Sequence, residues 1–505
     1  MKVINFSKEE QEKIMAQYAN LAFANLKKNI LQDLVNNRNE SIIYKKYTKE
    51  QIVRMMENPQ KNEEQIRQLS GFMYMISSHY RKLVDYYSTI LLYNYSVVPT
   101  KIPLERPKKT EYKKCYYHVI NQSEKYNLKH ECSKAIKIAV RDGVFYGICY
   151  ESEDSFYIRH FPHTKYAKIS SIEDGVHRFS IDMAYFNGKE YLLESYGQDF
   201  VDAYYLYKGN KEKGTKGDKK KKWYEIPNGI VVKFDETNPY CSLPAFSNLV
   251  LDIMSVDDFK LLHKAKTEGD NYKVLSFKLD TVDGVPVMDF DLASKYFHGA
   301  TQSLDASNWG AILSPFDVEA FTFQSTSSSA RNDVSDAIET VWKDAGVTPA
   351  LFGGVDISSS SAMLLATKPD EALAYSILQQ MERYFNYRLK KMNLKYSFKI
   401  SFSRLSIFNQ DEYANRISKA ASLSMPLKME YATVLGMSPS DTLGLTYLEE
   451  DVLNLSKKVW VSPLVSSNTV SYTGSETGRP AAEDSGQAIS DSNQNTRDSD
   501  ANDNR

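Results

Sequence analysis

Residues 325–393 carry the most informative pattern of this chain, STSSSARNDVSDAIETVWKDAGVTPALFGGVDISSSSAMLLATKPDEALAYSILQQMERYFNYRLKKMN. Its first part, 331–345, has apolar residues at the i, i+4, i+7 and i+8 spacing of a helix with one buried stripe: Val334, Ile338, Val341 and Trp342. Serines 327–329 precede it where an N-cap is expected, and Gly346 with Pro349 ends it.

A loop with two adjacent glycines follows, and then a long helix. The loop runs through Thr348-Pro-Ala-Leu-Phe-Gly-Gly354 to a run of serines at 358–361. The helix begins near Ala362 and continues past Met392. Pro369 interrupts it, and Thr367 and Asp370 have the spacing of a capping box, which predicts a kink or a restart of the helix.

Composition restricts the class of protein. The chain has 505 residues, 42% hydrophobic and 25% charged, which is enough for two or three domains with a buried core. The net charge of -1 provides no overall basic field for nucleic acid. No apolar run approaches the roughly 20 residues of a membrane span, and the start of the chain does not resemble a signal peptide. We therefore expect a soluble intracellular protein with no membrane partner. The cysteines form no CxxC pair and are predicted to be free thiols in a reducing compartment: Cys115, Cys132, Cys149 and Cys241.

The first 246 residues combine helices with strands. Helices are expected over 50–58 and 71–95, and two short ones within 113–143. From 144 to 234 the apolar pattern changes to alternation, which predicts antiparallel strands at 145–150, 156–161, 166–169, 180–186, 190–196, 203–207, 223–226 and 230–234. Asn187-Gly188 is a hairpin signal. The lysine-rich run 208–222 fits either a phosphate-binding segment or a solvated hairpin tip.

A small insert separates two helices in the second half of the chain. A helix over 246–268 leads to a strand at 273–278 and a turn at 280–284. A helix at 291–296 and strands at 311–313 and 319–324 follow. We expect the flanking helices, 247–270 and 331–345, to lie side by side as a stalk that carries the insert.

The C-terminal part is predicted to be a strand and several helices, followed by a disordered tail. The strand is expected at 396–402 and helices at 411–423, after 425, after 439 and over 443–455. The tail from Ser466 has seven acids against three arginines and few apolar residues, so it cannot bury enough surface to fold alone.

Patterns for catalysis, metals and cofactors are absent from the sequence. It contains no GxxxxGK[ST], no GxSxG and no HExxH. His160 and His163 flank Phe161-Pro162, but no matching carboxylate or cysteine accompanies them. We therefore expect no catalytic residues, no cofactor and no metal, and a protein that is not an enzyme.

The order of these elements resembles the portal protein of a tailed double-stranded DNA bacteriophage, of the type found in long-tailed phages of Gram-positive hosts. The loop 347–354, the serines and the helix 363–384 resemble the tunnel loop and long helix of that family. Residues 246–277 resemble its first stem helix entering the clip. Residues 425–428 and 433–441 resemble its C-terminal region. The resemblance covers residues 70–460.

The resemblance implies an α+β portal fold with named parts. The wing is 1–246 and the stem helices are 247–270 and 326–346. The clip is 271–325, the tunnel loop is 347–361, the long helix and a returning wing strand are 362–409, the crown is 410–462, and a disordered tail is 463–505. The resemblance also implies a homo-oligomeric ring, typically of twelve subunits, at one capsid vertex of the virion, assembled in the host cytoplasm. Its partners would be double-stranded DNA without sequence specificity, the terminase large subunit, major capsid or scaffold protein, and a head-completion (adaptor) protein. Such a ring is the channel for genome packaging and ejection.

Two groups of residues would line that channel. In the tunnel loop we expect Thr348, Gly353, Gly354, Asp356, Ser358, Ser359, Ser360 and Ser361 nearest the DNA. On the second stem helix we expect Asp333, Asp336, Glu339 and Lys343. A mainly acidic lining would repel phosphates and let DNA slide.

Three other interpretations remain open from the sequence. The chain also fits another phage head–tail connector or minor capsid protein, because the matching patterns concern the order of the elements and the residues that separate them, and not invariant catalytic residues. A metal-dependent enzyme with scattered carboxylates is a second alternative. A DNA-binding regulatory protein is the third, and would need a basic face that only Lys211 to Lys222 provides.

Overall fold

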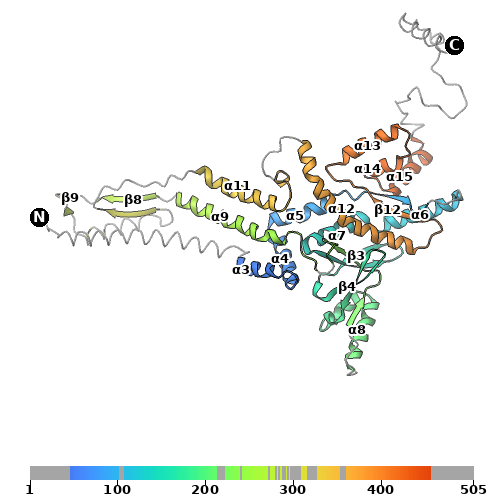
Figure 1. The fold of residues 1–505 in the computed structure, drawn as a ribbon, viewed down its shortest axis with the longest axis horizontal. Helices are drawn as coiled ribbons and strands as arrows, with labels where there is room; N and C mark the ends of the chain where they lie inside the picture. Colours follow the sequence, from blue (N-terminus) through green and yellow to red (C-terminus); the bar gives the residue numbers. More distant parts are fainter. Residues whose placement is uncertain are drawn as a thin grey trace, which may run out of the picture. The chain divides into compact units, whose positions relative to one another are not determined.

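The computed structural model describes residues 46–101, 107–212, 222–238, 241–270, 273–278, 281–282, 285–286, 292, 295, 309–314, 327–352 and 360–455 (Figure 1). The chain divides into two units, Met1–Ser440 and Asp441–Arg505. Helices and strands are both present, as the α+β prediction requires. None of the described helices is both long enough and apolar enough to span a bilayer.

The first described elements are helices that pack on one another. Their bounds are α3 Lys49–Glu57, α4 Glu63–Ile76, α5 Ser78–Thr89, α6 Lys109–Lys125 and α7 Leu128–Asp142. Contacts join α4 to α5, and both of these helices to α7. The single helix predicted over 71–95 is wrong, because Ser77 adopts an extended conformation between α4 and α5. Its hydroxyl accepts the N–H of Tyr80 at 3.3 Å, which is the usual action of a serine N-cap.

A six-stranded antiparallel sheet forms the second layer of this unit. Its strands are β2 Val144–Glu151, β3 Phe156–His160, β4 Ala167–Glu173, β5 Val176–Asp182, β6 Trp223–Glu225 and β7 Ile230–Lys233. The order is β3-β2-β7-β5-β4, and β6 pairs with β5. Five of the eight predicted strands are confirmed within one to four residues at their ends, and β5 overlaps a sixth.

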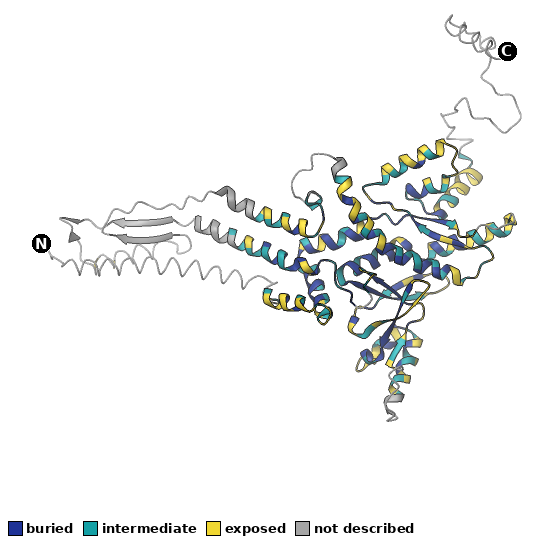
Figure 2. Ribbon diagram, viewed as in Figure 1, coloured by how far each residue is buried: buried dark blue, intermediate teal, exposed yellow. Residues whose placement is uncertain are grey.

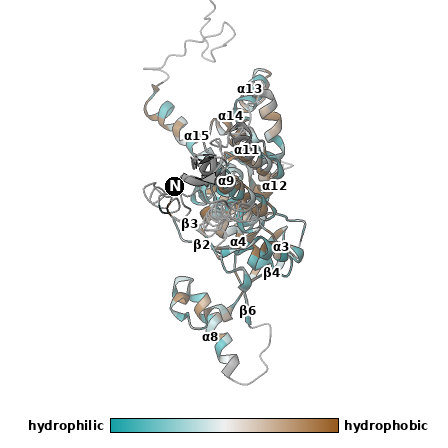
Figure 3. Cartoon of the chain, turned by 90° about the vertical axis from the view of Figure 1, so that its left-hand side faces the viewer, coloured by the Kyte–Doolittle hydropathy of each residue, from teal (hydrophilic) through white to brown (hydrophobic). Residues whose placement is uncertain are grey.

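The segment between β5 and β6 is helical where strands were predicted. Residues 183–186 and 190–195 form the 3-10 helices η2 (Met183–Phe186) and η3 (Glu190–Ser195), and 198–212 form α8 (Gln198–Glu212). Phe200 and Tyr204 are buried and lie four residues apart, while Tyr205 is exposed, so the burial has helical spacing. The apolar alternation that predicted strands here was misleading, because aromatic residues also fill the buried face of a helix. Brown and teal residues both occur along α8 in Figure 3.

Two further expectations in this segment fail with it. Asn187-Gly188 joins η2 to η3, so it is not the turn of a two-stranded hairpin. The lysine-rich run 208–222 begins as the last turn of α8, which argues against a hairpin tip there. Its residues 213–221 lie outside the described part of the chain, and the Nζ of Lys222 lies 2.7 Å from a carboxylate oxygen of Asp182.

The long helix α12 (Ser360–Lys391) crosses the unit and connects its layers. It contacts α5, α7, β5, β7 and the strand β12 (Phe398–Phe402), which pairs with β1 (Tyr95–Pro99) in antiparallel register. One face of the helix is buried: Ile377, Leu378, Met381, Tyr384 and Phe385. In Figure 2 the buried residues gather on α5, α7 and α12, while α13 (Gln410–Ser422) has many exposed ones.

Of the kink or restart predicted at Pro369, the restart is wrong. The helix is continuous through Pro369. The capping box does not form, because Thr367 donates its hydroxyl to the carbonyl of Leu364 at 3.1 Å. The carboxylate of Asp370 instead accepts hydrogen bonds from another helix, as described below.

The stalk expected around the insert is present. Helix α9 (Val250–Asp270) packs against α11 (Ser327–Asp344), as Figure 1 shows. At the insert, β8 (Lys273–Lys278) pairs in parallel with β11 (Trp309–Ser314), and β9 (Thr281–Val282) pairs with β10 (Val285–Pro286) around the predicted turn. Most of the helix expected at 291–296 and the strand at 319–324 lie outside the described residues. The serines 327–329 belong to α11, so their prediction as an N-cap before the helix is wrong.

The first unit ends in α13 and α14 (Lys428–Val434), which pack together over Leu405, Ile417 and Val434. Helix α15 (Pro439–Thr446) begins at the boundary of the two units. In the second unit η7 (Tyr447–Val452) follows, and Thr446 donates its hydroxyl to the carbonyl of Thr442 at 2.7 Å. Residues 1–45 and the predicted disordered tail, 463–505, lie outside the described part of the chain.

Candidate functional site at the root of the paired helices

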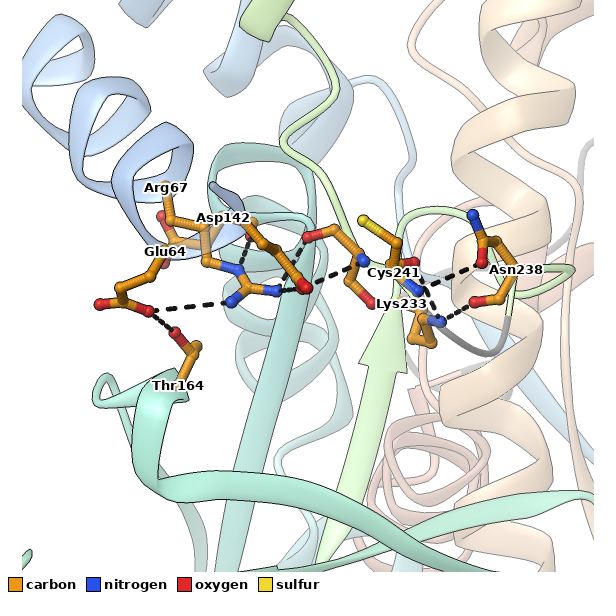
Figure 4. Close-up of polar contacts among 9 residues, drawn as sticks. Glu64, Arg67, Asp142, Thr164, Lys233, Asn238 and Cys241 are labelled. Carbon is orange, nitrogen blue, oxygen red and sulfur yellow. Dashed lines mark hydrogen bonds and ion pairs between the residues drawn. The ribbon is translucent and has the colours of Figure 1, made fainter. Parts of the chain in front are cut away.

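The root of α9, meaning residues 242–249 that lead into this helix, is held by a network of polar contacts centred on Arg67 of α4 (Figure 4). The guanidinium donates to the carbonyls of Asp142 and Ser242, each at 2.9 Å. It also forms ion pairs with Glu63 and, at 3.9 Å, with Glu64. Because Ser242 lies in the segment that leads into α9, Arg67 fixes this segment to the ends of α4 and α7.

A glycine allows this segment to pass close to the end of α7. Gly143 has φ +80°, and a Cβ built on it would lie 2.5 Å from the backbone carbon and oxygen of Leu243. The N–H of Ala245 donates to the carbonyl of Val140 at 3.1 Å in the same place. Any side chain at 143 would therefore push the root of α9 away from α7.

A buried lysine organises the turn before this segment. Lys233 ends β7 and is 1% exposed, and burial lowers the pKa of its ammonium group. The ammonium donates to the carbonyls of Asn238 and, at 3.4 Å, of Cys241 (Figure 4). The side chain of Asn238 accepts the N–H of Cys241 at 3.2 Å. These contacts close the turn between β7 and the root of α9.

Helix α3 makes a second set of polar contacts with α9. The Nζ of Lys49 lies 2.8 Å from a carboxylate oxygen of Asp258 and 3.1 Å from the hydroxyl of Ser255. Both partners belong to α9, so its first turns are fixed from two sides.

The root of α11, meaning its C-terminal end around Trp342, is held by aromatic stacking. Trp342 is buried, and the ring of Phe352, in the 3-10 helix η6 (Pro349–Phe352), stacks on it with centroids 4.5 Å apart and planes 17° apart. Two side chains of α5 surround the pair: His79 meets Trp342 at 5.3 Å, and Tyr86 meets Phe352 at 5.4 Å. Burial, with Lys260 and Lys82 nearby, lowers the pKa of His79, so the neutral ring packs here at neutral pH.

The same face of α5 also holds α12. Asp370 is 4% exposed, and its carboxylate accepts the hydroxyls of Tyr86 at 3.0 Å and Tyr87 at 2.9 Å. Burial raises the pKa of Asp370, and these two hydrogen bonds offset part of that increase. Helix α5 therefore anchors both segments that flank residues 353–359, the first through Phe352 and the second through Asp370.

The predicted tunnel-loop residues fall in three places. Thr348 is half-buried, and its carbonyl accepts the N–H of Leu351 at 3.1 Å as η6 begins. Ser360 and Ser361 belong to the first turn of α12, so their prediction as loop residues is wrong. The remaining predicted residues lie outside the described part of the chain: Gly353, Gly354, Asp356, Ser358 and Ser359.

The predicted stem residues all lie on α11. Asp336 and Lys343 are exposed, and a Glu339 carboxylate oxygen lies 2.7 Å from the Nζ of Lys343 one helical turn later. Asp333 belongs to the same helix. Burial, and to a smaller extent the carboxylate of Asp344 on α11, raise the pKa of Asp252 on α9. The charge of one stalk helix therefore affects a carboxyl group of the other.

Metal ligands do not cluster among the described residues. No group of three His, Cys, Asp or Glu side chains there could hold a metal ion. His160 stacks on Phe145, and burial lowers its pKa to about 4. The four cysteines are free, as predicted, and burial raises the pKa of Cys149 to about 12, which keeps its thiol protonated.

The aromatic anchor on α5 is not evident from the sequence. The wide apolar face at 72–87 predicts burial on more than one side, but it does not name the partners. The sequence spacing of Trp342 and Phe352 does not predict that their rings stack. The two residues are ten positions apart, and the stacking depends on how η6 folds back toward α11.

Comparison with known proteins gives remote likeness only. No protein-family model matches the chain, and no curated protein is significantly similar to it. A chain in the neck of an empty GTA particle, computed with C6 symmetry, is similar over 73% of this chain and 94% of its own, with 12% identity and a TM-score of 0.39. A chain in the virion of a native gene transfer agent (GTA) particle is similar over 71% and 88%, with 10% identity and a TM-score of 0.36. Likeness of this degree does not establish a shared function.

Proposed function

We propose that this chain is a structural protein of a phage-type particle and, specifically, a portal protein that acts as a ring around double-stranded DNA without catalysing a reaction. The observation that carries the proposal is the pair α9 and α11. These helices pack side by side and flank an insert in which β8 and β11 pair. Two stem helices on either side of a clip are what the resemblance of the sequence to portal proteins implies.

The anchoring of the stalk supports a mechanical role. A channel through which DNA moves must transmit force from its stem to the rest of the ring. Here α9 is fixed by Arg67 and Lys49, and α11 by Trp342. Polar contacts and ring stacking at a helix root resist displacement and contribute no reactive group, which suits a scaffold.

The charge on α11 is compatible with DNA sliding past it. Asp336 is exposed, and Lys343 forms an ion pair with Glu339. An exposed carboxylate repels the phosphates of DNA. A net charge of -1 means that the chain as a whole has no excess of cations, which would give salt-dependent affinity for DNA. In the proposed ring, terminase and an adaptor protein would meet the insert, and capsid or scaffold protein would meet residues 1–246.

The experiment that tests the proposal is the mass and symmetry of the purified full-length protein, by light scattering and negative-stain imaging. We expect rings of about twelve subunits with a central hole. Monomers or dimers that stay so after capsid or scaffold protein is added would contradict the proposal, and would favour a connector or minor capsid protein.

A further inference from the structure

A groove between α3 and α4 has no role in the stalk or in its anchoring. Two adjoining cavities of about 530 and 490 Å³ share Lys46, Tyr47 and Gln68 and form it. We propose that this groove binds an acidic peptide segment that inserts an apolar side chain, supplied by another protein.

The first cavity has an apolar floor beneath a cation. Phe72, on α4, is 8% exposed, and Met75, one turn later, is 64% exposed. The Nζ of Lys46 lies 4.3 Å from the centroid of the Phe72 ring, and the ring of Tyr47 lies 5.5 Å from the same ring. An aliphatic or aromatic side chain fits beside Met75, where it would remove that side chain from water.

Charge in the groove selects an acidic partner. Lys46, Arg54 and Arg141 line the two cavities, and none of the described lining residues is a carboxylate. Arg141 already binds Asp142 through two hydrogen bonds of 2.7 Å, so Lys46 and Arg54 provide the available charge. Glu64 is close to Gln68, but its carboxylate is bound by Thr164 and paired with Arg67.

A glycine inside α4 is an independent sign of a partner. Gly71 lines the first cavity in the middle of the helix, where glycine is unfavourable relative to alanine. A Cβ built on it would meet no atom within 4 Å, so packing inside this chain does not require glycine. A backbone that approaches α4 closely at this point would require it. Gln65 and Gln68, which line the groove, can bond the amides of such a backbone.

Nucleic acid is the weaker candidate for this groove. A phosphate backbone is held by several unpaired cations in a row. This groove provides two, next to a buried phenylalanine and an exposed methionine.

The test is a selection of random displayed twelve-residue peptides on the full-length protein, followed by binding measurements with the selected peptides. We expect the enriched peptides to be net negative and to carry an aromatic or aliphatic residue. They should bind at least tenfold more weakly to Lys46→Glu/Arg54→Glu. Gly71→Leu, which fills the open space, should weaken binding as much and unfold at an unchanged or higher temperature.

The matched control is Lys113→Glu/Lys114→Glu on α6. It changes the same number of charges, and Lys113 also lies over a tyrosine ring, at 5.3 Å from Tyr117. This variant should bind like the wild type. Enriched peptides that are not acidic, or that bind the groove variants as tightly as the wild type, would overturn the proposal. A (dT)12 oligonucleotide that binds more tightly than every selected peptide would overturn it in favour of nucleic acid.

Discussion

Replacing Phe352 by alanine should release the root of α11 and η6 without unfolding the chain. The ring is half-buried and stacks on Trp342 at 4.5 Å. Burial of half a phenylalanine contributes about 1 kcal/mol, and an aromatic pair adds about 1 kcal/mol beyond burial. A loss of about 2 kcal/mol makes local opening about 30-fold more frequent.

Hydrogen exchange measured by mass spectrometry checks this magnitude. Peptides that cover 343–352 contain two reporter amides: Val347, which donates to the Trp342 carbonyl at 3.2 Å, and Leu351, which donates to Thr348. Their protection should fall about 30-fold in Phe352→Ala and several-fold in Phe352→Leu, which keeps burial but loses the stack. Tyr191→Ala, at a side chain that is 78% exposed, should leave it unchanged. A change below threefold in Phe352→Ala would refute the anchoring role.

Three further predictions concern the same region. Tyr87→Phe removes a hydroxyl that favours the ionised form of Asp370, so it should cost about 1–2 kcal/mol at pH 7 in urea unfolding. The fold raises the pKa of Asp370, so ionisation of Asp370 lowers the stability of the protein as the pH rises above the ordinary carboxyl range. At acid pH, where Asp370 is protonated, Tyr87→Phe should therefore cost less stability than at pH 7. An equal cost of Tyr87→Phe at acid pH and at pH 7 would contradict this. Gly143→Ala should cost at least about 1 kcal/mol more than Gly188→Ala, because both have positive φ but only Gly143 meets backbone at 2.5 Å; equal losses in urea unfolding would count against the close approach. Lys343→Ala should leave the thermal midpoint unchanged, since the lysine of its pair with Glu339 is exposed to solvent; a clear drop would mean that this pair supports α11.

Sequence patterns predicted the structure best where periodicity and length agreed. The stalk helix 331–345 followed from its apolar spacing, and the strand at 273–278 was predicted with the bounds that it has in the structure. These patterns failed between 183 and 212, where apolar alternation predicted strands and the chain is helical. The buried Phe200 and Tyr204 lie four residues apart, which is helical spacing, but the exposed Tyr205 beside them hides it.

The contacts that anchor the stalk could not be predicted. Asp370 had the spacing of a capping residue, but in the fold its carboxylate is used by two tyrosines more than 280 positions away along the chain. Arg67 binds the carbonyl of Ser242, 175 positions away. Such contacts depend on how the layers pack, and a local pattern carries no information about them. Gly143 is an intermediate case, since a glycine after a helix predicts a C-cap but not the close passage of Leu243.

In the proposed closed ring, α9 and α11 surround the channel. A cryo-electron microscopy reconstruction of the purified assembly would show where these helices lie. We predict a ring of about twelve subunits in which Asp336 on α11 faces the central hole. A ring with α9 and α11 on its outer surface, or particles with no ring when capsid or scaffold protein is present, would contradict the account.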